Sequence, residues 1–391
     1  MTAPAQNGFA LRLGEALDYF GSASKAVFRP GIPDRLAPGI DACCRLILPA
    51  GGQSVPKMNV FNPRLNPPAV EQIAIEPHLI YPFYVVGLRH GLLLNEAGHV
   101  ADRTGHVFIE SMRDRVFLAE SLYAAHDLRD PAYCRALEAR IAAGVRRLPG
   151  RALSLIYVMG SANWYHWVVE NLARLQAAET LDGFAEMQVL LPRGLDAARE
   201  ETLLRLGIGR ERWVIHDGEP LVCDELYLPA FGAIRGSVRP EPVRWVRDRF
   251  AEAGPPATRR LYISRSDARW RRLANEDAVF AGLAPLGFER VSLTRLGFEA
   301  QRQLFHSART IVAPHGAGLG NLVFSQPGTL LVELLSERRD GSVLRVYHTL
   351  AVLLGLPYLG VKCVELDGPA ADFMLDPAVL PAILPGLLAR S

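Results

Sequence analysis

The chain has 391 residues, of which 49% are hydrophobic and 21% are charged. These are ordinary values for a globular protein, and the length suggests two domains. The formal net charge is only +2, so the charge balance gives no reason to expect a nucleic-acid partner. The five cysteines include no Cys-x-x-Cys pair, which argues against a zinc site or a disulfide framework and favours a reducing compartment.

The sequence has no obvious targeting or membrane-spanning segment. Its first residues lack the basic stretch and apolar core of a signal peptide. The most apolar late stretch, 343–361, contains Arg345, His348 and Pro357, so it predicts a buried helix followed by a strand. We expect a cytoplasmic protein, and peripheral contact with the inner face of a membrane stays open as an alternative.

The N-terminal part is weakly patterned. Residues 1 to about 75 are rich in proline and glycine and predict an irregular leader with short strands. From 74 to 121 apolar and polar residues alternate, which is typical of a small antiparallel region. Residues 131–146 predict a helix. We therefore take 1–150 as an irregular, β-rich region that leads into the first domain.

From Leu153 onward, short apolar runs alternate with segments of helical spacing. The predicted strands lie at 153–160, 187–192, 213–218 and 225–230, with helices at 164–180 and about 198–207. Such alternation predicts a Rossmann-like domain built on a parallel sheet, here residues 151–240. A further helix at 240–256 ends in Gly-Pro-Pro at 254–256, where we place the linker between the domains.

The same alternation returns in residues 257–375 and predicts a second Rossmann-like domain. Its strands are expected at 260–265, 288–293, 310–313, 328–335 and 357–366, and its helices at 275–287, 297–308 and 343–355. Residues 376–391 predict a C-terminal helix. The expected fold class is therefore α/β, with two Rossmann-like domains and a small β-rich N-terminal extension.

A glycine-rich turn follows the predicted strand at 310–313. His315-Gly316-Ala317-Gly318 opens a helix, and the free N–H groups and positive dipole end of a helix N-terminus suit a phosphate. His315 can donate a hydrogen bond to a phosphate or to a sugar hydroxyl. The spacing alone fits equally well a tight turn whose glycines serve only packing. The first domain has no Gly-x-Gly-x-x-Gly followed by an acid, which weighs against a dinucleotide enzyme.

Ser264 and Arg265 end the first strand of the second domain, where ligands bind in open α/β sheets. An arginine there can form two parallel hydrogen bonds to a diphosphate, and Ser264 can add a hydroxyl contact. The arginines that follow, at 269, 271 and 272, predict a solvated basic loop. Asn275 and Glu276 open the next helix as cap and first-turn acid, and ordering of the ligand loop is the alternative role for Asn275.

Aromatic and titratable residues cluster at the start of the first domain. Trp164 and Tyr165 offer aromatic faces to a sugar, and Asn163 precedes them. His166 and Glu170 lie four residues apart, so they are neighbours on a helix, where each can tune the pKa of the other. Either side chain can act as a general base. The alternative is a core helix with a hydrogen-bonded histidine.

Glu333 ends the strand that follows the glycine loop. Its carboxylate can accept hydrogen bonds from ribose hydroxyls, or it is simply an acid at the end of a strand. His306 is expected to be a structural helix residue. The sequence contains no Asp-x-Asp pair and no His-Glu-x-x-His motif, so no metal site is predicted.

Taken together, these residues resemble glycosyltransferase family 61, which includes many capsular polysaccharide biosynthesis proteins. The motifs that carry the resemblance are at 163–175, 262–265, 275–277, 286–309, 314–322 and 327–334. The resemblance covers about 150–365. It implies a GT-B fold of two facing Rossmann-like domains, a nucleoside-diphosphate sugar as donor with UDP as the usual carrier, inversion at the anomeric carbon, and neither metal nor other cofactor.

The resemblance also assigns roles. Donor-binding residues are expected in the C-terminal half, at Ser264, Arg265, Asn275, His315, Gly316, Ala317, Gly318, Asn321 and Glu333. The N-terminal half is expected to hold a glycan acceptor, such as a growing capsular or surface polysaccharide, at Asn163, Trp164 and Tyr165. Relatives with an acidic residue near Glu170 favour it slightly over His166 as the base. The alternative function is a non-catalytic module that binds a nucleotide sugar or a glycan without turnover.

Overall fold

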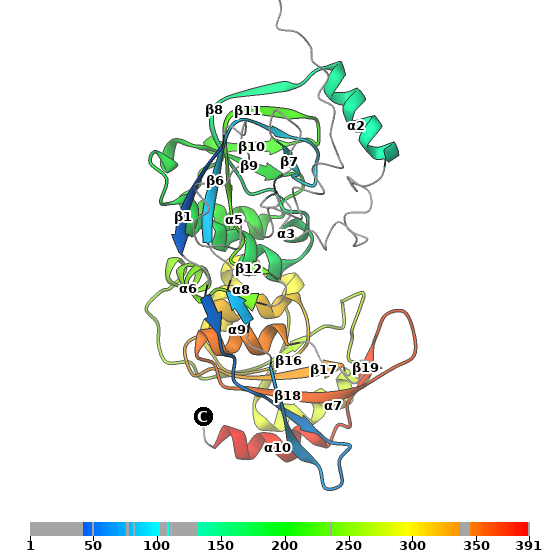
Figure 1. Cartoon of the computed structure of the whole chain (residues 1–391). Helices are drawn as coiled ribbons and strands as arrows, with labels where there is room; N and C mark the ends of the chain where they lie inside the picture. The colour runs from blue at the N-terminus through cyan, green and yellow to red at the C-terminus, as the bar shows by residue number, and fades with distance from the viewer. Residues whose placement is uncertain are drawn as a thin grey trace, which may run out of the picture. The chain divides into compact units, whose positions relative to one another are not determined.

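Two sheets rich in parallel strands organise the chain, each with its own helices (Figure 1). The computed structural model describes residues 42–48, 51–75, 78–80, 83–101, 108, 111, 131–234, 237–336 and 345–389. The expectations for residues 1–41 and for most of 102–130 lie outside these ranges. The first compact unit comprises Met1–Gly51 and Leu79–Arg235, and the second comprises Gly52–His78 and Gly236–Ser391. The Gly-Pro-Pro segment at 254–256 lies within the second unit.

The first unit is built on a mixed sheet with the order β1-β6-β11-β8-β9-β10. Its strands are β1 (Ala42–Leu48), β6 (Phe83–Leu93), β7 (Val100–Ala101), β8 (Arg146–Ser154), β9 (Gln188–Pro192), β10 (Trp213–His216) and β11 (Leu221–Pro229). Strands β8, β9, β10 and β11 run parallel, whereas β6 pairs antiparallel with β11 and β1 pairs antiparallel with β6. The predicted antiparallel strands therefore extend this sheet and do not form a separate region. Strand β6 is buried along most of its length, as expected when both faces of a sheet are covered.

The helices of the first unit are α2 (Pro131–Ala143), α3 (Val158–Ala162), α4 (Leu175–Ala178) and α5 (Ala197–Arg205). The prediction of a strand over 153–160 is wrong in part, because β8 ends at Ser154 and α3 begins at Val158. A short apolar run does not distinguish a strand from a buried helix by periodicity. The predicted helix at 164–180 consists of a π-helical segment (His166–Asn171), a 3₁₀ turn (Leu172–Arg174) and α4.

The second unit contains an eight-stranded sheet with the order β15-β14-β16-β17-β18-β3-β4, and β19 pairs with β18. Its strands are β3 (Met58–Asn62), β4 (Ala69–Ile73), β14 (Arg259–Ser264), β15 (Phe288–Ser292), β16 (Ala308–Pro314), β17 (Leu330–Ser336), β18 (Tyr358–Glu365) and β19 (Phe373–Met374). From β14 to β18 the strands are parallel and follow the doubly wound order 2-1-3-4-5. The direction of winding reverses between β14 and β16. This position is the topological switch point, where such sheets bind ligands.

Helices of the second unit agree with the predicted alternation. They are α6 (Pro240–Arg249), α7 (Glu276–Leu283), α8 (Phe298–His306), α9 (Val346–Leu354) and α10 (Val379–Leu388). Helix α10 is the predicted C-terminal helix, and its Leu380 and Leu384 share a buried cluster with Val279 and Leu283 of α7. The helix predicted after the start of the glycine loop is a 3₁₀ helix (Ala317–Phe324).

Part of the N-terminal region completes the second sheet. Strand β3 pairs in parallel with β18, and β4 pairs antiparallel with β3. Met58 and Val60 of β3 are fully buried in a cluster with Leu335. The Nζ of Lys362 also lies 2.7 Å from a carboxylate oxygen of Glu71. Residues 52–75 are therefore an integral part of the second unit, which corrects the prediction of an irregular leader.

The remaining short strands form two-stranded ladders, β2 (Gly51–Gln53) with β5 (His78–Ile80) and β12 (Ala233–Ile234) with β13 (Ser237–Val238). Across the described ranges, the helices are all too short or too polar to cross a lipid bilayer.

Candidate functional site

Arg265 and Gly316 meet at the switch point of the second sheet. Arg265 follows β14 directly, and Gly316 lies two residues after the end of β16. A Cβ atom placed on Gly316 would lie 1.8 Å from Nη1 of Arg265, so the guanidinium rests against the backbone of the glycine loop. The strand-end arginine and the glycine loop therefore lie side by side. Only a residue without a side chain allows this approach.

The guanidinium of Arg265 forms no ion pair with the residues that the structure describes. Its Nη2 donates to the carbonyl oxygen of Trp270 at 3.0 Å, whereas its buried Nε has no hydrogen-bond partner there. Burial lowers the pKa of Arg265, and the nearby positive charge of Arg271 lowers it further, whereas the negative charge of Asp267 offsets part of this effect. A bound anion would favour the charged form further, because it adds opposite charge and a hydrogen-bond acceptor.

Glu276 fixes the end of β14. One of its carboxylate oxygens accepts from the Tyr262 hydroxyl at 3.0 Å and from the Arg265 amide at 3.2 Å, and the other accepts from the Ser264 hydroxyl at 2.8 Å. Glu276 is buried, so it does more than the first-turn acid that the sequence suggested. The Ser264 hydroxyl donates within this turn, so the structure gives it a role in orienting Arg265.

The loop after β14 is tied to the segment before α10. The side-chain amide of Asn275 donates to the carbonyl oxygen of Leu375 at 2.7 Å and accepts from the amide of Leu375 at 3.3 Å. Arg272 donates two hydrogen bonds to Asp372, at 3.0 and 2.7 Å. Asn275 therefore orders the loop, and Arg272 is paired rather than only solvated.

His315 is held by a buried carboxylate. Its Nδ1 lies 2.6 Å from Oε1 of Glu333, and the Tyr358 hydroxyl donates to Oε2 of Glu333 at 2.7 Å. Glu333 is 0% exposed, and both of its oxygens are occupied by protein groups. This position does not fit the predicted contact with ribose hydroxyls. Glu333 instead orients the ring of His315 through Nδ1, so that Nε2 accepts from a ligand hydroxyl when the ring is neutral and donates to a phosphate only when the ring is an imidazolium.

The glycine loop presents backbone amides beside this histidine. The amide of His315 donates to the carbonyl oxygen of Leu334 at 3.1 Å, and the amide of Leu319 donates to that of Gly316 at 2.9 Å. The first amides of the 3₁₀ helix, at Ala317 and Gly318, have no acceptor within a helix that begins there. Such amides, together with a guanidinium and an imidazole, suit a phosphate group.

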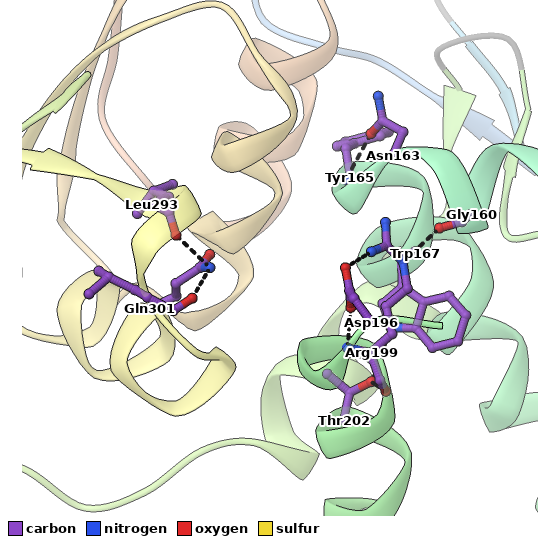
Figure 2. A network of polar contacts seen from close by, with 10 residues as sticks. Gly160, Asn163, Tyr165, Trp167, Asp196, Arg199, Thr202, Leu293 and Gln301 are labelled. Atoms are coloured by element: carbon purple, nitrogen blue, oxygen red, sulfur yellow. Dashed lines mark hydrogen bonds and ion pairs between the residues drawn. The ribbon is translucent and has the colours of Figure 1, made fainter. Parts of the chain in front are cut away.

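Asn321 supports the loop from behind. Its side-chain amide donates to Oε1 of Gln301 at 2.8 Å, and Gln301 donates to the carbonyl oxygens of Leu293 and Leu296 at 3.1 and 2.9 Å. Figure 2 shows the contact between Gln301 and Leu293. A Cβ atom on Gly318 would lie 2.6 Å from a methyl group of Leu293. Since Asn321 is fully buried, its predicted contact with a ligand gives way to a role in holding the loop.

The first sheet has its own switch point, between β8 and β11, because β9 and β10 lie on one side of β8 and the chain then returns to the other. Tyr157 follows β8 and Phe231 follows β11, and their rings lie 4.7 Å apart. The Tyr157 hydroxyl donates to Oε2 of Glu170 at 2.7 Å. Nδ1 of His166 lies 2.8 Å from the same oxygen, which confirms that His166 and Glu170 are neighbours.

The two members of this pair differ in their access to solvent. The side chain of His166 is 17% exposed, whereas that of Glu170 is 4% exposed. Both lie on the π-helical segment, a type of distortion found frequently at functional sites. A histidine oriented by a buried carboxylate is an arrangement that can accept a proton from a substrate hydroxyl.

The three predicted acceptor residues are used differently. Oδ1 of Asn163 accepts from the amide of Tyr165 at 2.9 Å (Figure 2) and from that of His166 at 3.4 Å, so it holds the turn that leads into the π-helical segment. Tyr165 is buried, with its ring against His166. Trp164 is half-buried and retains surface for a ligand.

Arg199 of α5 braces the same segment, and no sequence signal pointed to it. Its Nε donates to the carbonyl oxygen of Gly160 at 3.1 Å, and it forms an ion pair with Asp196 (Figure 2). The guanidinium carbon lies 5.7 and 5.8 Å from the ring centres of Trp164 and Trp167. Burial lowers the pKa of Arg199, and Asp196 offsets part of this effect.

A second arginine, Arg174, supports the switch point of the first sheet. It is fully buried, and its Nε donates to the carbonyl oxygen of Pro229 at 2.8 Å. Its guanidinium carbon lies 4.4 Å from the ring centre of Phe231. Within the described part of the chain, no three His, Cys, Asp or Glu side chains are grouped so that they could bind a metal ion.

The comparisons with known proteins agree with this geometry. Residues 164–332 match the family model described as Glycosyltransferase 61. The match begins two residues before His166 and includes Glu170, Arg265 and the glycine loop, so it covers residues of both switch-point sites. The protein is a glycosyltransferase, which uses a sugar donor and a glycan acceptor. A comparison with curated proteins gave no match.

Proposed function

We propose that the protein transfers a sugar from a nucleoside-diphosphate sugar, with UDP as the carrier, to a glycan acceptor. The proposed transfer inverts the anomeric carbon, needs no metal, and serves the synthesis of a capsular or other surface polysaccharide in the cytoplasm, at or near the inner face of the membrane. The proposal includes the GT-B arrangement of two facing Rossmann-like domains. The contact of the Arg265 guanidinium with Gly316 at the switch point carries it.

In the second unit, the groups around the glycine loop stabilise the leaving diphosphate. Negative charge builds up on this group as the bond to the sugar breaks, so fixed hydrogen-bond donors stabilise the transition state more than the ground state. Arg265 supplies the guanidinium, and Ala317 and Gly318 supply amides. His315, as an imidazolium that Glu333 orients through Nδ1, supplies an Nε2–H donor.

In the first unit, His166 and Glu170 form the base. An inverting displacement requires a group that removes the proton of the acceptor hydroxyl. His166 is the more exposed member of the pair, so we assign it the direct role and Glu170 the orienting role. This reverses the slight preference for Glu170 that the family resemblance implied.

Binding and transfer assays with nucleotide sugars test the proposal. We expect one class among UDP-, GDP-, CDP- and dTDP-linked sugars to raise the melting temperature, since a ligand at 100 times its Kd stabilises the folded state by about 2.7 kcal/mol. Arg265→Ala should remove this stabilisation, whereas Arg269→Ala, the same loss of charge at an exposed position, should retain it. Binding of no nucleotide sugar would refute the proposal. Binding without transfer to any glycan acceptor would favour the non-catalytic module.

A further inference from the structure

A pocket of about 350 Å³ opens beside the diphosphate site and has no role in the function described so far. It lies within the second unit, at the carboxyl ends of β17 and β18 and beside two loops. Its lining residues are Trp270, Arg271, Ser336, Glu365, Pro369, Ala370 and Ala371. The volume falls in the range of small-molecule sites, and the carboxyl edge of a parallel sheet is where such folds bind ligands.

Trp270 connects this pocket to Arg265. Its carbonyl oxygen accepts the hydrogen bond from Nη2 of Arg265 at 3.0 Å. A residue that lines the pocket is therefore in direct contact with the guanidinium. Trp270 is 57% exposed. An exposed tryptophan that borders a pocket offers a stacking surface for a planar group.

The walls of the pocket are fixed before any ligand binds. The amide of Arg271 donates to the carbonyl oxygen of Ala370 at 2.8 Å, which joins the two loops. Arg271 and Ala371 both have left-handed backbones, with φ values of 56° and 48°. Residues other than glycine rarely adopt this conformation, and when they do, they concentrate at functional sites.

The charged side chains at the pocket favour one orientation of a bound nucleotide. Glu365 borders the pocket, and one of its carboxylate oxygens accepts from the Ser336 hydroxyl at 2.7 Å. A carboxylate repels phosphate but accepts hydrogen bonds from the two hydroxyls of a ribose. The anionic end of the ligand is therefore directed toward Arg265 and the neighbouring Arg271, and a neutral, hydroxyl-bearing end toward Glu365.

We propose that this pocket binds the nucleoside of the donor. The base stacks on Trp270, the ribose hydroxyls donate to Glu365, and the diphosphate extends to Arg265 and the glycine loop. The inference rests on the proposed function and assigns to Glu365 the ribose contact that the buried Glu333 does not provide. The competing occupant is the sugar that is transferred.

Calorimetric titrations of the full chain with UDP, a UDP-sugar and inorganic pyrophosphate test the assignment. If the melting-temperature assay selects a GDP-, CDP- or dTDP-linked sugar, the corresponding nucleoside diphosphate replaces UDP. Trp270→Ala should weaken UDP binding about 5- to 100-fold, the range that stacking of a base on an aromatic ring supplies. Trp270→Phe should restore most of the affinity, and pyrophosphate binding should not change. Met374→Ala, which shortens another exposed apolar side chain, should leave UDP binding unchanged.

The ribose contact has a separate test. Wild-type protein should bind UDP more tightly than its 2′,3′-dideoxy analogue, and Glu365→Gln should reduce this difference at least several-fold. Unchanged UDP binding in Trp270→Ala would overturn the assignment, and weakened binding of the UDP-sugar alone would give the pocket to the transferred sugar. If Arg265→Ala abolishes UDP binding but Trp270→Ala does not affect it, the assignment of the nucleoside to this pocket is wrong, and the proposed function stands. If no nucleoside diphosphate binds to wild-type protein, the proposed function fails with it.

Discussion

Nδ1 of His315 lies 2.6 Å from Oε1 of Glu333, a carboxylate that no solvent reaches. The other carboxylate oxygen accepts from the Tyr358 hydroxyl. Glu333 therefore receives two donors from opposite sides, and the ring of His315 has one orientation in which its second nitrogen remains available. The proposed donor site depends on this arrangement because the imidazole has no other ionic partner among the described residues.

Glu333→Gln should destabilise the protein and weaken donor binding. The new amide group turns a donor toward either His315 or Tyr358, and an unsatisfied buried polar group costs about 1–3 kcal/mol. Tyr358→Phe removes one hydrogen bond but leaves the contact with His315 intact, so its effect on donor affinity should be smaller. Urea unfolding and nucleotide titration of both variants check the order of effects. Equal loss of affinity in the two variants would contradict the prediction that Glu333→Gln weakens donor binding more than Tyr358→Phe.

Gly316→Ala should reduce donor affinity without unfolding the protein. The added methyl group would lie 1.8 Å from the end of the Arg265 side chain, which is flexible enough to move away. The guanidinium then leaves the loop, and the loss of a charge-assisted hydrogen bond, about 1.5–3 kcal/mol, corresponds to roughly 10- to 150-fold weaker binding. Gly386→Ala is the control, because a Cβ atom there meets no atom within 4 Å. Wild-type affinity in Gly316→Ala would show that Arg265 does not act from this position.

His166→Asn and Glu170→Gln should both abolish most of the transfer and leave nucleotide binding unchanged. Removal of a general base costs about 10²- to 10⁴-fold in rate, and loss of its orienting carboxylate has a comparable effect. Initial rates at saturating donor measure this, with nucleotide titration of the same variants as the control. Transfer that survives in His166→Asn but not in Glu170→Gln would assign the base to Glu170 instead.

Arg199→Ala should destabilise the first unit. The substitution removes the hydrogen bond to Gly160, the ion pair with Asp196 and the cation–π contacts with two tryptophans. Buried hydrogen bonds of a charged group and cation–π contacts suggest a loss of about 2–4 kcal/mol in the free energy of unfolding. Arg205→Ala, at a more exposed position of the same helix, should cost less than about 1 kcal/mol. Thermal and chemical unfolding distinguish these values.

Acid should destabilise the protein partly through His348. Burial lowers the pKa of this imidazole to about 4 from its ordinary value of 6.5. Between these values the unfolded chain binds a proton that the folded protein does not, so stability is lost as the pH falls from 6.5 toward 4, by at most about 3 kcal/mol. His348→Phe should reduce the difference between urea unfolding at pH 7 and at pH 4.5. A difference equal to that of the wild type would exclude this contribution.

The sequence predicted best those features that depend on local spacing or on strand ends. His166 and Glu170 are neighbours because positions four apart share a face even where the helix widens. Arg265 and Gly316 meet because the carboxyl ends of parallel strands lie at one edge of a sheet. Both statements follow from periodicity and topology alone.

The hydrogen-bond partners that complete these sites come from distant parts of the chain, and no sequence pattern predicts them. Tyr157 reaches Glu170 only because β8 ends at Ser154, whereas the apolar run suggested a strand that continues to residue 160. Tyr358 reaches Glu333 through the register of β17 with β18. The burial of Glu333, which excludes a ribose contact, likewise depends on how the second unit packs and not on the residue's place in its strand.

Strand β3 lies beside β18, about 300 positions later in the chain, and this pairing has a consequence for biosynthesis. The N-terminal strands leave the ribosome long before β18 is synthesised. Met58 and Val60 therefore cannot be buried in their core until almost the whole chain has been made. Contacts between such remote segments slow folding, because a long loop must close before the contact forms. A fragment that begins after residue 235 would expose the edge of β18, and an uncovered edge strand invites aggregation. The two units are therefore inseparable as contiguous pieces of polypeptide, even though each has its own sheet.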